Sequence, residues 1–504
     1  MSTPPLTDQW PELLRQLLLG TDQQPSTPAE AAEDPAAQLL TDVGTAHLLR
    51  RGAQALRTWS DNIPTLAAAE TRRACSWRSI QHLQTILSGD RLSALPEFAR
   101  LLERHDRCLP PESLPDLLNQ CVEDASLWPL LQPILGQRGQ WLLAQHPAWS
   151  RLAISLAQAQ EWPNVKGKEQ LTLFQRFRRL DPAAARADLL LRWSQLTHQQ
   201  QARILPALAV NLSAADETFL ETARLAKRKP IRLAACDLLA RLPDSALVNR
   251  LWEHAKTVVQ RRGKTITVTL PDPLPKAMIA DGIERKGSKT RLGLGGNWLL
   301  QLLSRLPISR WEQHWQLDSS ALFGEVAQSD TAQIWLSAWV ESLSRFPNTV
   351  ATRTLLRGWL LRDDDTLWDN PKAKQLLRQA DSDIFNECLI PWVQQHGPLI
   401  YEGSMAAYWL GLGQHAWDPV LSKFIVFGFR DLLQTRRIPE WELYHYRRIL
   451  QAGAYQSDPA LFDVFKRGWS FQSSGFGRWQ VEVEQLLQTL NFRREMRAAL
   501  ATTT

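Results

Sequence analysis

The fold class is indicated by residues 181–255, DPAAARADLLLRWSQLTHQQQARILPALAVNLSAADETFLETARLAKRKPIRLAACDLLARLPDSALVNRLWEHA. Side-chain oxygens of Asp, Ser and Thr accept the unpaired backbone N–H groups of a first helical turn, and Pro fits the first helical position. Such helix-start signals recur about every sixteen residues, at Asp181-Pro182, Thr197 with Gln200, Ser213 with Asp216, Pro230, and Asp244-Ser245. The stretch therefore predicts five short helices in succession.

Apolar residues between these signals follow a helical period. The fourth run fits the spacing i, i+3, i+4, i+7, i+8 with Ile231, Ala234, Ala235, Leu238 and Leu239. A short helix of this kind cannot bury its apolar face alone, so neighbouring helices must stack. Two helices give a repeat of about 32 residues, within the range of helical repeats. The tetratricopeptide pattern is absent, and the Pro-Ile-Arg opening at 230–232 favours HEAT-like repeats.

One segment interrupts the helical pattern. Residues 264–270 alternate Thr with Ile, Val and Leu, which is typical of a strand, and residues 282–296 are rich in Gly and Lys. We therefore predict an all-α, HEAT-like α-solenoid of helix hairpins with one small β/loop insertion. The predicted regions are an N-terminal helix (8–19) with a flexible acidic linker in 1–35, a helical region 36–162, the repeat array 163–260, the insertion 261–296 and a C-terminal helical region 297–504.

Composition favours a cytoplasmic protein. No apolar stretch in the 504 residues approaches the length of roughly 18–20 residues that a membrane helix needs. No basic segment followed by an apolar run marks a secretory signal. The five cysteines are scattered, without metal-ligand spacing, at Cys75, Cys108, Cys121, Cys236 and Cys388. We expect free, mostly buried thiols and no contact with a membrane. We likewise expect that most of the 22 tryptophans pack between helices.

The positive charge is concentrated in one part of the chain. Residues 221–295 hold sixteen Lys and Arg against seven Asp and Glu, whereas the whole chain has a net charge of +6. This basic band is either a solvated helix face or a contact surface for an acidic protein or for phosphates. Trp252 is its only Trp, Tyr or Phe at positions 221–295, which disfavours base stacking. The candidate partner or phosphate contacts are Arg228, Lys229, Arg261, Arg262, Lys264, Arg285, Lys286, Lys289 and Arg291.

No residue set specifies a reaction. Gly263-Lys264-Thr265 lacks the first glycine of a phosphate loop and precedes a strand, and the Gly293–Gly296 run reads as a tight turn before a helix at Trp298. The Asp363–Asp365 run lacks the calcium-loop pattern and is expected in a solvated loop. We expect no catalytic, cofactor-binding or metal-ligating residues and no cofactor. A dispersed active site remains an alternative, since a triad is recognised in space. His146, which precedes Pro147, and His396, His415 and His445, which are isolated in sequence, are expected to be packed or exposed histidines and not catalytic bases.

Several segments resemble a bacterial helical family of unknown function. They include Gly136–Leu142 with Pro147-Ala148-Trp149, Leu212-Ser213 with Phe219–Glu221, Ile231–Ala235, Leu238–Pro243, and Trp298–Gln301 with Pro307 and Trp311. Members of that family are typically encoded beside MoxR-type AAA+ ATPases, von Willebrand factor A proteins and SWIM zinc-finger proteins. The resemblance implies a role in such a module and carries no catalytic residues with it.

Together these observations predict a non-enzymatic scaffold or adaptor that binds protein partners. The resemblance suggests a AAA+ ATPase and a von Willebrand A protein as those partners. The alternative is a helical-repeat protein that binds nucleic acid weakly through the basic band 221–295.

Overall fold

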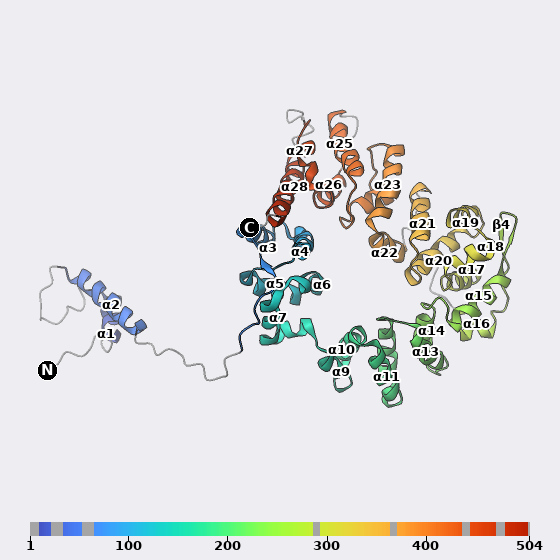
Figure 1. Cartoon of the computed structure of the whole chain (residues 1–504), viewed down its shortest axis with the longest axis horizontal. Coiled ribbons are helices and arrows are strands. Elements are labelled where there is room, and N and C mark those ends of the chain that lie inside the picture. Colours follow the sequence, from blue (N-terminus) through green and yellow to red (C-terminus); the bar gives the residue numbers. More distant parts are fainter. Residues whose placement is uncertain are drawn as a thin grey trace. The chain divides into compact units, whose positions relative to one another are not determined.

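The structure is a computed structural model that describes residues 10–21, 34–52, 65–285, 293–362, 370–435, 444–469 and 479–501 (Figure 1). These residues are mostly helical, as predicted. The chain divides into two compact units, Met1–Leu66 and Ala67–Thr504, and each is described by itself. None of the described helices is both long enough and apolar enough to cross a membrane.

The first unit contains two helices that pack against each other, α1 (Trp10–Leu19) and α2 (Pro35–Gly52). Leu13 and Ala46 are buried between them. Gly20, with a φ of 82°, follows α1 at the predicted end of the N-terminal helix. The predicted cap Asp8 and linker residues 22–33 lie outside the described residues.

The second unit begins with a group of short helices around a core of their own. These helices are α3 (Trp77–Leu87), α4 (Leu95–Arg104), α5 (Leu114–Glu123), α6 (Trp128–Leu131), α7 (Gly136–Gln145) and α8 (Pro147–Ser150). Two short strands, β1 (Arg73–Ala74) and β2 (Arg107–Cys108), pair in parallel. The sequence pattern predicts helices alone here, because two residues are too few for a strand period to appear. The glycines at 136 and 139 predict a break in the helices, and the helices are interrupted at Leu135, directly before Gly136, whose φ is 67°.

The next helices follow the predicted start signals. They are α9 (Leu156–Gln160), α10 (Gly167–Leu180), α11 (Pro182–Arg192), α12 (His198–Ile204), α13 (Glu217–Arg224), α14 (Lys229–Leu239) and α15 (Ala246–Val258). Asp181 accepts a hydrogen bond from the backbone of Ala184, and Ser245 from that of Val248, at 2.9 and 3.2 Å. Thr197 with Gln200, and Ser213 with Asp216, form capping boxes. The five predicted starts are therefore confirmed.

Pro206 changes the helix type. We expect a kinked helix there, but α12 ends at Ile204 and a 3₁₀ helix spans Leu205–Ala209. The helix therefore changes from α to 3₁₀ at this point and does not continue as a kinked α-helix. The ring of Pro206 and its missing N–H prevent the α-helical hydrogen bonds from continuing.

The predicted strand is confirmed as β4 (Thr265–Val268), which pairs antiparallel with β3 (Val259–Arg262). The sequence does not predict β3, because residues 259–262 continue the helical run without an alternating pattern. Helix α16 (Lys276–Ala280) follows, and α17 spans Gly293–Leu303. The glycine run 293–296 is thus the first turn of a helix. The expectation of a glycine hinge or tight turn before a helix at Trp298 is wrong in placing the helix start after the run, although Gly293 itself has a left-handed φ of 67°.

In the C-terminal region most helices contact the helix after next. The helices are α18 (Ile308–Trp315), α19 (Ser319–Val326), α20 (Ala332–Arg345), α21 (Thr349–Arg362), α22 (Pro371–Gln379), α23 (Ser382–His396), α24 (Met405–Leu410), α25 (Pro419–Thr435), α26 (Tyr446–Gln456), α27 (Phe462–Phe465) and α28 (Gln480–Ala501). The contacting pairs include α19 with α21, α20 with α22, α21 with α23, α23 with α25, α24 with α26, and α26 with α28. Each helix thus covers part of the apolar face of another.

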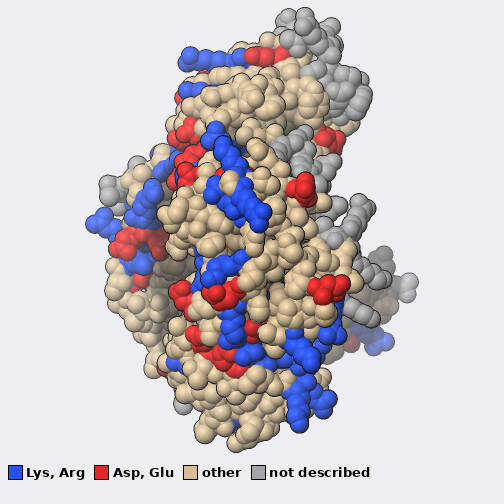
Figure 2. Space-filling model, turned by 90° about the vertical axis from the view of Figure 1, so that its right-hand side faces the viewer, with Lys and Arg blue, Asp and Glu red and all other residues tan. Residues whose placement is uncertain are grey.

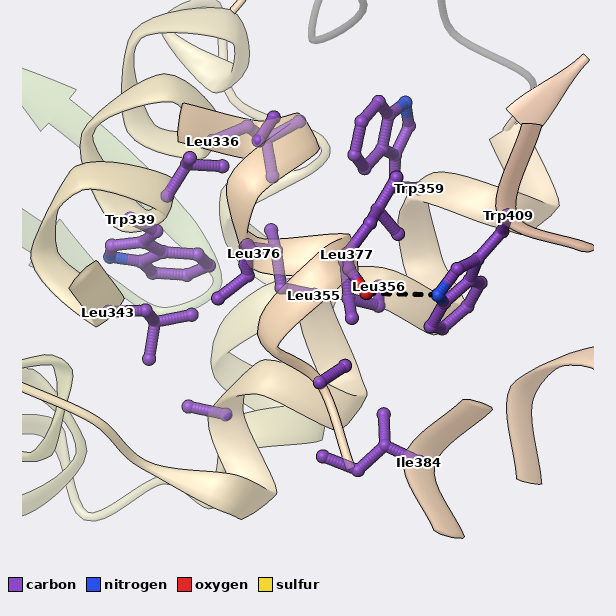
Figure 3. Close-up of a cluster of buried hydrophobic side chains, with 14 of the residues drawn as sticks. Leu336, Trp339, Leu343, Leu355, Leu356, Trp359, Leu376, Leu377, Ile384 and Trp409 are labelled. Atoms are coloured by element: carbon purple, nitrogen blue, oxygen red, sulfur yellow. Dashed lines mark hydrogen bonds between the residues drawn. The ribbon is translucent and has the colours of Figure 1, made fainter. Parts of the chain in front are cut away.

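Large aromatic side chains fill the spaces between these helices. Trp335, Trp339 and Trp359 are buried as expected, whereas Trp193, Trp252 and Trp298 are half-buried. In the cluster of Figure 3, the indole N–H of Trp409 on α24 donates a hydrogen bond to the carbonyl of Leu377 on α22, at 3.1 Å. Such bonds satisfy the polar atom of a ring whose area is otherwise apolar.

Two hydrophobic cores result, and α28 joins them. The smaller core lies among α3 to α7, and the larger core extends from Ala159 to Leu490. Met496 and Leu500 of α28 belong to the smaller core, whereas Val483, Leu486 and Leu490 of the same helix belong to the larger. Helix α28 contacts α3 and α4 as well as α26, so the last helix of the second unit lies beside its first (Figure 1).

Leu238 tests the predicted buried stripe of α14. It is buried in the larger core. We expect Leu238→Asp to reduce the free energy of unfolding by about 3–5 kcal/mol, because an unpaired buried carboxylate loses its hydration without compensation. Thermal unfolding measures this change, and Asp237→Asn on the half-exposed side of the same turn is the milder comparison. An unchanged melting temperature for Leu238→Asp would contradict the assigned stripe.

Candidate functional site

The β3–β4 hairpin carries three of the candidate cations. Arg262 pairs with Thr265 across the two strands, and Gly263 with Lys264 forms the connecting turn. Gly263 has a φ of 61°, a left-handed conformation that a turn requires and that glycine adopts most easily. The Gly-Lys-Thr sequence therefore closes a hairpin and does not stand between a strand and a helix, as a phosphate loop would.

Arg261 is held by an ion pair across the fold. Its Nε and Nη2 donate hydrogen bonds to the two carboxylate oxygens of Glu325 on α19, at 2.6 and 2.7 Å. These hydrogen bonds lower the pKa of Glu325 and raise that of Arg261. Arg261 thus anchors the hairpin to α19, while Arg262 and Lys264 are exposed without an ion pair to any described residue.

A second group of candidates lies at the start of α14. Arg228 and Lys229 are exposed there, and the Lys229 ammonium pairs with Glu284 at 2.5 Å. The next residue, Arg285, is exposed, and its carbonyl accepts a hydrogen bond from the indole of Trp298 at 3.2 Å. The structure thus brings Lys229 beside the segment that contains Arg285. Lys286, Lys289 and Arg291 lie outside the described residues.

Other cations of the basic band are bound inside the fold. Asp281 is buried and accepts hydrogen bonds from Arg250 at 2.9–3.1 Å, and it pairs with Arg224 at 3.2 Å. Glu221 pairs with the same two arginines. The hydrogen bond to Asp281 raises the pKa of Arg250. This four-residue network joins α13 and α15 to the turn after α16, and it uses two of the band's charges for packing.

Asp237 neutralises further charge in the same way. Its carboxylate lies 2.8 Å from Arg241, in the turn after α14, and 3.4 Å from Arg345 on α20. The sequence shows the excess of cations but does not show which carboxylates pair with them. The carboxylates of Glu221, Asp281 and Glu325 lie up to 64 positions along the chain from the arginines that they bind. On the face shown in Figure 2, Lys and Arg accordingly alternate with Asp and Glu instead of forming one uniform patch.

The turn after α16 depends on a close approach of backbone to side chain. Gly282 has a φ of 91°, and a Cβ at this position would lie 2.8 Å from the Cβ of Cys236. Glycine at 282 therefore allows Asp281 to enter the network with Arg224 and Arg250. The five cysteines are unpaired, and burial raises the pKa of Cys236 to about 11.

The candidate histidines make packing contacts. His415 is buried, and its Nε2 lies 2.9 Å from the carbonyl oxygen of Leu377 and 3.1 Å from the indole nitrogen of Trp409. Burial lowers the pKa of His415. His396 stacks on Trp392, and His146 lies beside Trp149. His445 contacts Tyr446. The Asp363–Asp365 run lies outside the described residues.

A shallow pocket adjoins α15 and α18. Its volume is about 430 Å³, and its lining includes Trp252, Arg310 and His314. Arg310 is fixed by hydrogen bonds from Nη2 to the carbonyl of Pro243 and to Asn249, both at 2.7 Å. Among the described residues, no three His, Cys, Asp or Glu side chains gather in a way that could hold a metal ion.

Comparison with known proteins places the chain in a family. No curated protein and no solved structure matches it. One family model, described as a family of unknown function (DUF5691), matches residues 12–500, which is nearly the whole chain. The match agrees with the resemblance to a family of unknown function that the sequence motifs indicate. The chain therefore belongs to the DUF5691 family of unknown function.

Proposed function

We propose that this chain is a non-enzymatic α-solenoid scaffold of HEAT-like helix hairpins that binds other proteins. The observation that carries the proposal is the contact of helices with the helix after next, seen repeatedly from α19 to α28. Stacked hairpins of this kind present long continuous surfaces, which repeat proteins use for binding. The proposed setting, a module with a MoxR-type AAA+ ATPase and a von Willebrand factor A protein, rests on the family resemblance.

The proposed contact surface consists of the exposed part of the insertion and the start of α14, where Lys229 pairs with Glu284. Arg228, Arg262, Lys264 and Arg285 are exposed and make no ion pair with any described residue. Cations that are not neutralised within the fold remain available to an acidic partner, and they would raise the rate of association with it. Lys286, Lys289 and Arg291 add three further charges in the adjoining segment.

Residues 286–291 can be removed while the hydrogen bonds that hold the preceding residues, Glu284 and Arg285, remain. The backbone of Glu284 exchanges hydrogen bonds with the side chain of Gln301, at 2.9 and 3.3 Å, and Arg285 is held by Trp298. We expect replacement of Lys286–Arg291 by a short Gly-Ser bridge to leave the melting temperature nearly unchanged. Capture of the purified AAA+ ATPase or von Willebrand A protein should weaken at least about tenfold, a loss of about 1.4 kcal/mol.

The matched control keeps the original length and replaces only Lys286, Lys289 and Arg291 by Ser. It should lose capture as the bridge variant does if charge is responsible. Equal capture by the bridge variant and the parent, measured by biolayer interferometry, would place the binding surface elsewhere.

A second candidate function is weak, sequence-independent binding of nucleic acid, which the same exposed cations favour. Binding through phosphates weakens steeply with salt because counterions are released. We expect replacement of Arg228, Arg262, Lys264 and Arg285 by Ala to flatten the salt dependence of DNA binding, measured by fluorescence anisotropy. The matched control replaces four exposed cations of C-terminal helices and turns, Arg357, Lys423, Lys466 and Arg467. Tight, sequence-discriminating binding at physiological salt would favour nucleic acid over a protein partner.

A further inference from the structure

The second unit contains two hydrophobic cores, which meet at α28 and at Tyr455 of α26. Residues up to Ala153 pack on the smaller core, and Ile154 is the first residue that packs on the larger one. The backbone changes there from a 3₁₀ helix, Arg151–Ala153, to the extended cap Ser155 of α9. Ala153 and Ile154 therefore form the covalent connection between an N-terminal body (67–153) and a C-terminal body (154–501).

The described polar contacts that cross between the bodies reach α28. The Glu97 carboxylate on α4 accepts a hydrogen bond from Arg493 Nε at 2.5 Å and from Arg497 Nε at 2.6 Å. The hydroxyls of Ser76 and Ser79 at the start of α3 donate to the carbonyl of Ala499, at 3.3 and 3.2 Å. These contacts form the seam between α28 and the helices α3 and α4.

Two further contacts involve Arg91, which lies between α3 and α4. Its Nη1 donates a hydrogen bond to the hydroxyl of Thr489 at 2.6 Å, and its guanidinium lies 5.2 Å from the centre of the Phe492 ring. The ring centre of His82 on α3 lies 5.1 Å from that of Phe492. Five residues of the seam on its N-terminal side are thus polar or charged: Ser76, Ser79, His82, Arg91 and Glu97. Interfaces of this polarity resemble those between domains that move relative to each other.

Buried hydrogen bonds and apolar contacts hold helix α28 on the C-terminal body. Arg493 is buried, and its Nη1 donates hydrogen bonds to the carbonyls of Ala454 and Ser457, both at 2.8 Å. The apolar residues Val483, Leu486 and Leu490 fix the first half of the helix in the larger core. If the seam separates, Arg493 therefore keeps two acceptors and gains water, so its charge is not left without partners.

The packing between the bodies is incomplete beside the seam. A partly open pocket of about 230 Å³ lies between Ser93 of the N-terminal body and residues of the C-terminal body that include Gly413, Arg448 and Tyr455. On the apolar side, Met496 and Leu500 insert into the smaller core, with Phe492 partly buried at its edge. A small apolar contact and a shared carboxylate thus hold a boundary that is not fully packed.

We propose that the seam is a latch, and that the second unit opens when the N-terminal body rotates about Ala153–Ile154 away from α28. Glu97 is the central group of the latch, because one carboxylate binds two guanidiniums. Opening exposes the faces of α3 and α4 that α28 covers in the closed form. Salt promotes opening, since it screens the pair of Glu97 with Arg497, whose side chain is 42% exposed, while the pair with Arg493, whose side chain is 4% exposed, is screened little.

The test measures the distance between spin labels on cysteines introduced at Gln84 of α3 and Gln451 of α26, both exposed. The parent should give one dominant short distance, and a second, longer distance should increase in about 0.5 M salt. Glu97→Gln should increase the longer population severalfold at low salt, with unchanged far-UV circular dichroism. The matched control is Asp463→Asn, which removes the exposed pair of Arg494 on the same helix at 3.0 Å and should leave the distribution unchanged.

A single distance in the parent at every salt concentration, unchanged by Glu97→Gln, would overturn the latch. If Glu97→Gln fails to fold, Arg497→Gln removes one of the two guanidiniums and leaves Arg493 in place, and the same comparison applies. An equal increase of the longer distance in Asp463→Asn would also overturn the latch, because it would reflect general loosening of α28.

Discussion

The structure depends on the packing of short helices against their neighbours, since none of them buries its apolar face alone. In the second unit this requirement also applies to the first and the last helices. Helix α28 places Leu486 and Leu490 in the larger core and Met496 and Leu500 in the smaller one. A linear stack needs special end helices to cover its terminal faces. Here the first and last helices of the unit cover each other.

The positively charged side chains of the basic band fall into two groups, those in ion pairs and those exposed without one. Arg224 and Arg250 are committed to Asp281, and Arg261 to Glu325, so these arginines hold helices and the hairpin in place. Arg262 and Lys264 project from the same hairpin without such partners among the described residues. Some cations of the basic band thus form ion pairs that hold the fold together, whereas others are exposed and unpaired among the described residues. The proposed binding function concerns only the second.

Local signals in the sequence predict local structure well. The cap residues Asp181 and Ser245 begin the expected helices, and alternation predicts the strand at Thr265–Val268. Contacts between distant residues leave no such signal. Glu97 and Arg493 are 396 positions apart, and nothing in the spacing of either residue indicates their pairing. The same holds for Asp281, whose burial and two arginine partners arise only when three helical segments come together. Among the candidate cations, Arg262 and Lys264 are exposed, whereas Arg261 and Lys229 are paired with Glu325 and Glu284, and the sequence does not predict these pairs.

Hydrogen exchange tests most directly whether α28 couples the two cores. Amide protection would be compared, peptide by peptide, between the full chain and a chain that ends before Phe492 and so lacks Arg493, Met496 and Leu500. The account predicts that protection falls in α3 and α4, more than 390 positions away in sequence, as well as in α26, while α11 and α14 keep theirs. Unchanged protection of α3 and α4 in the shortened chain would contradict it.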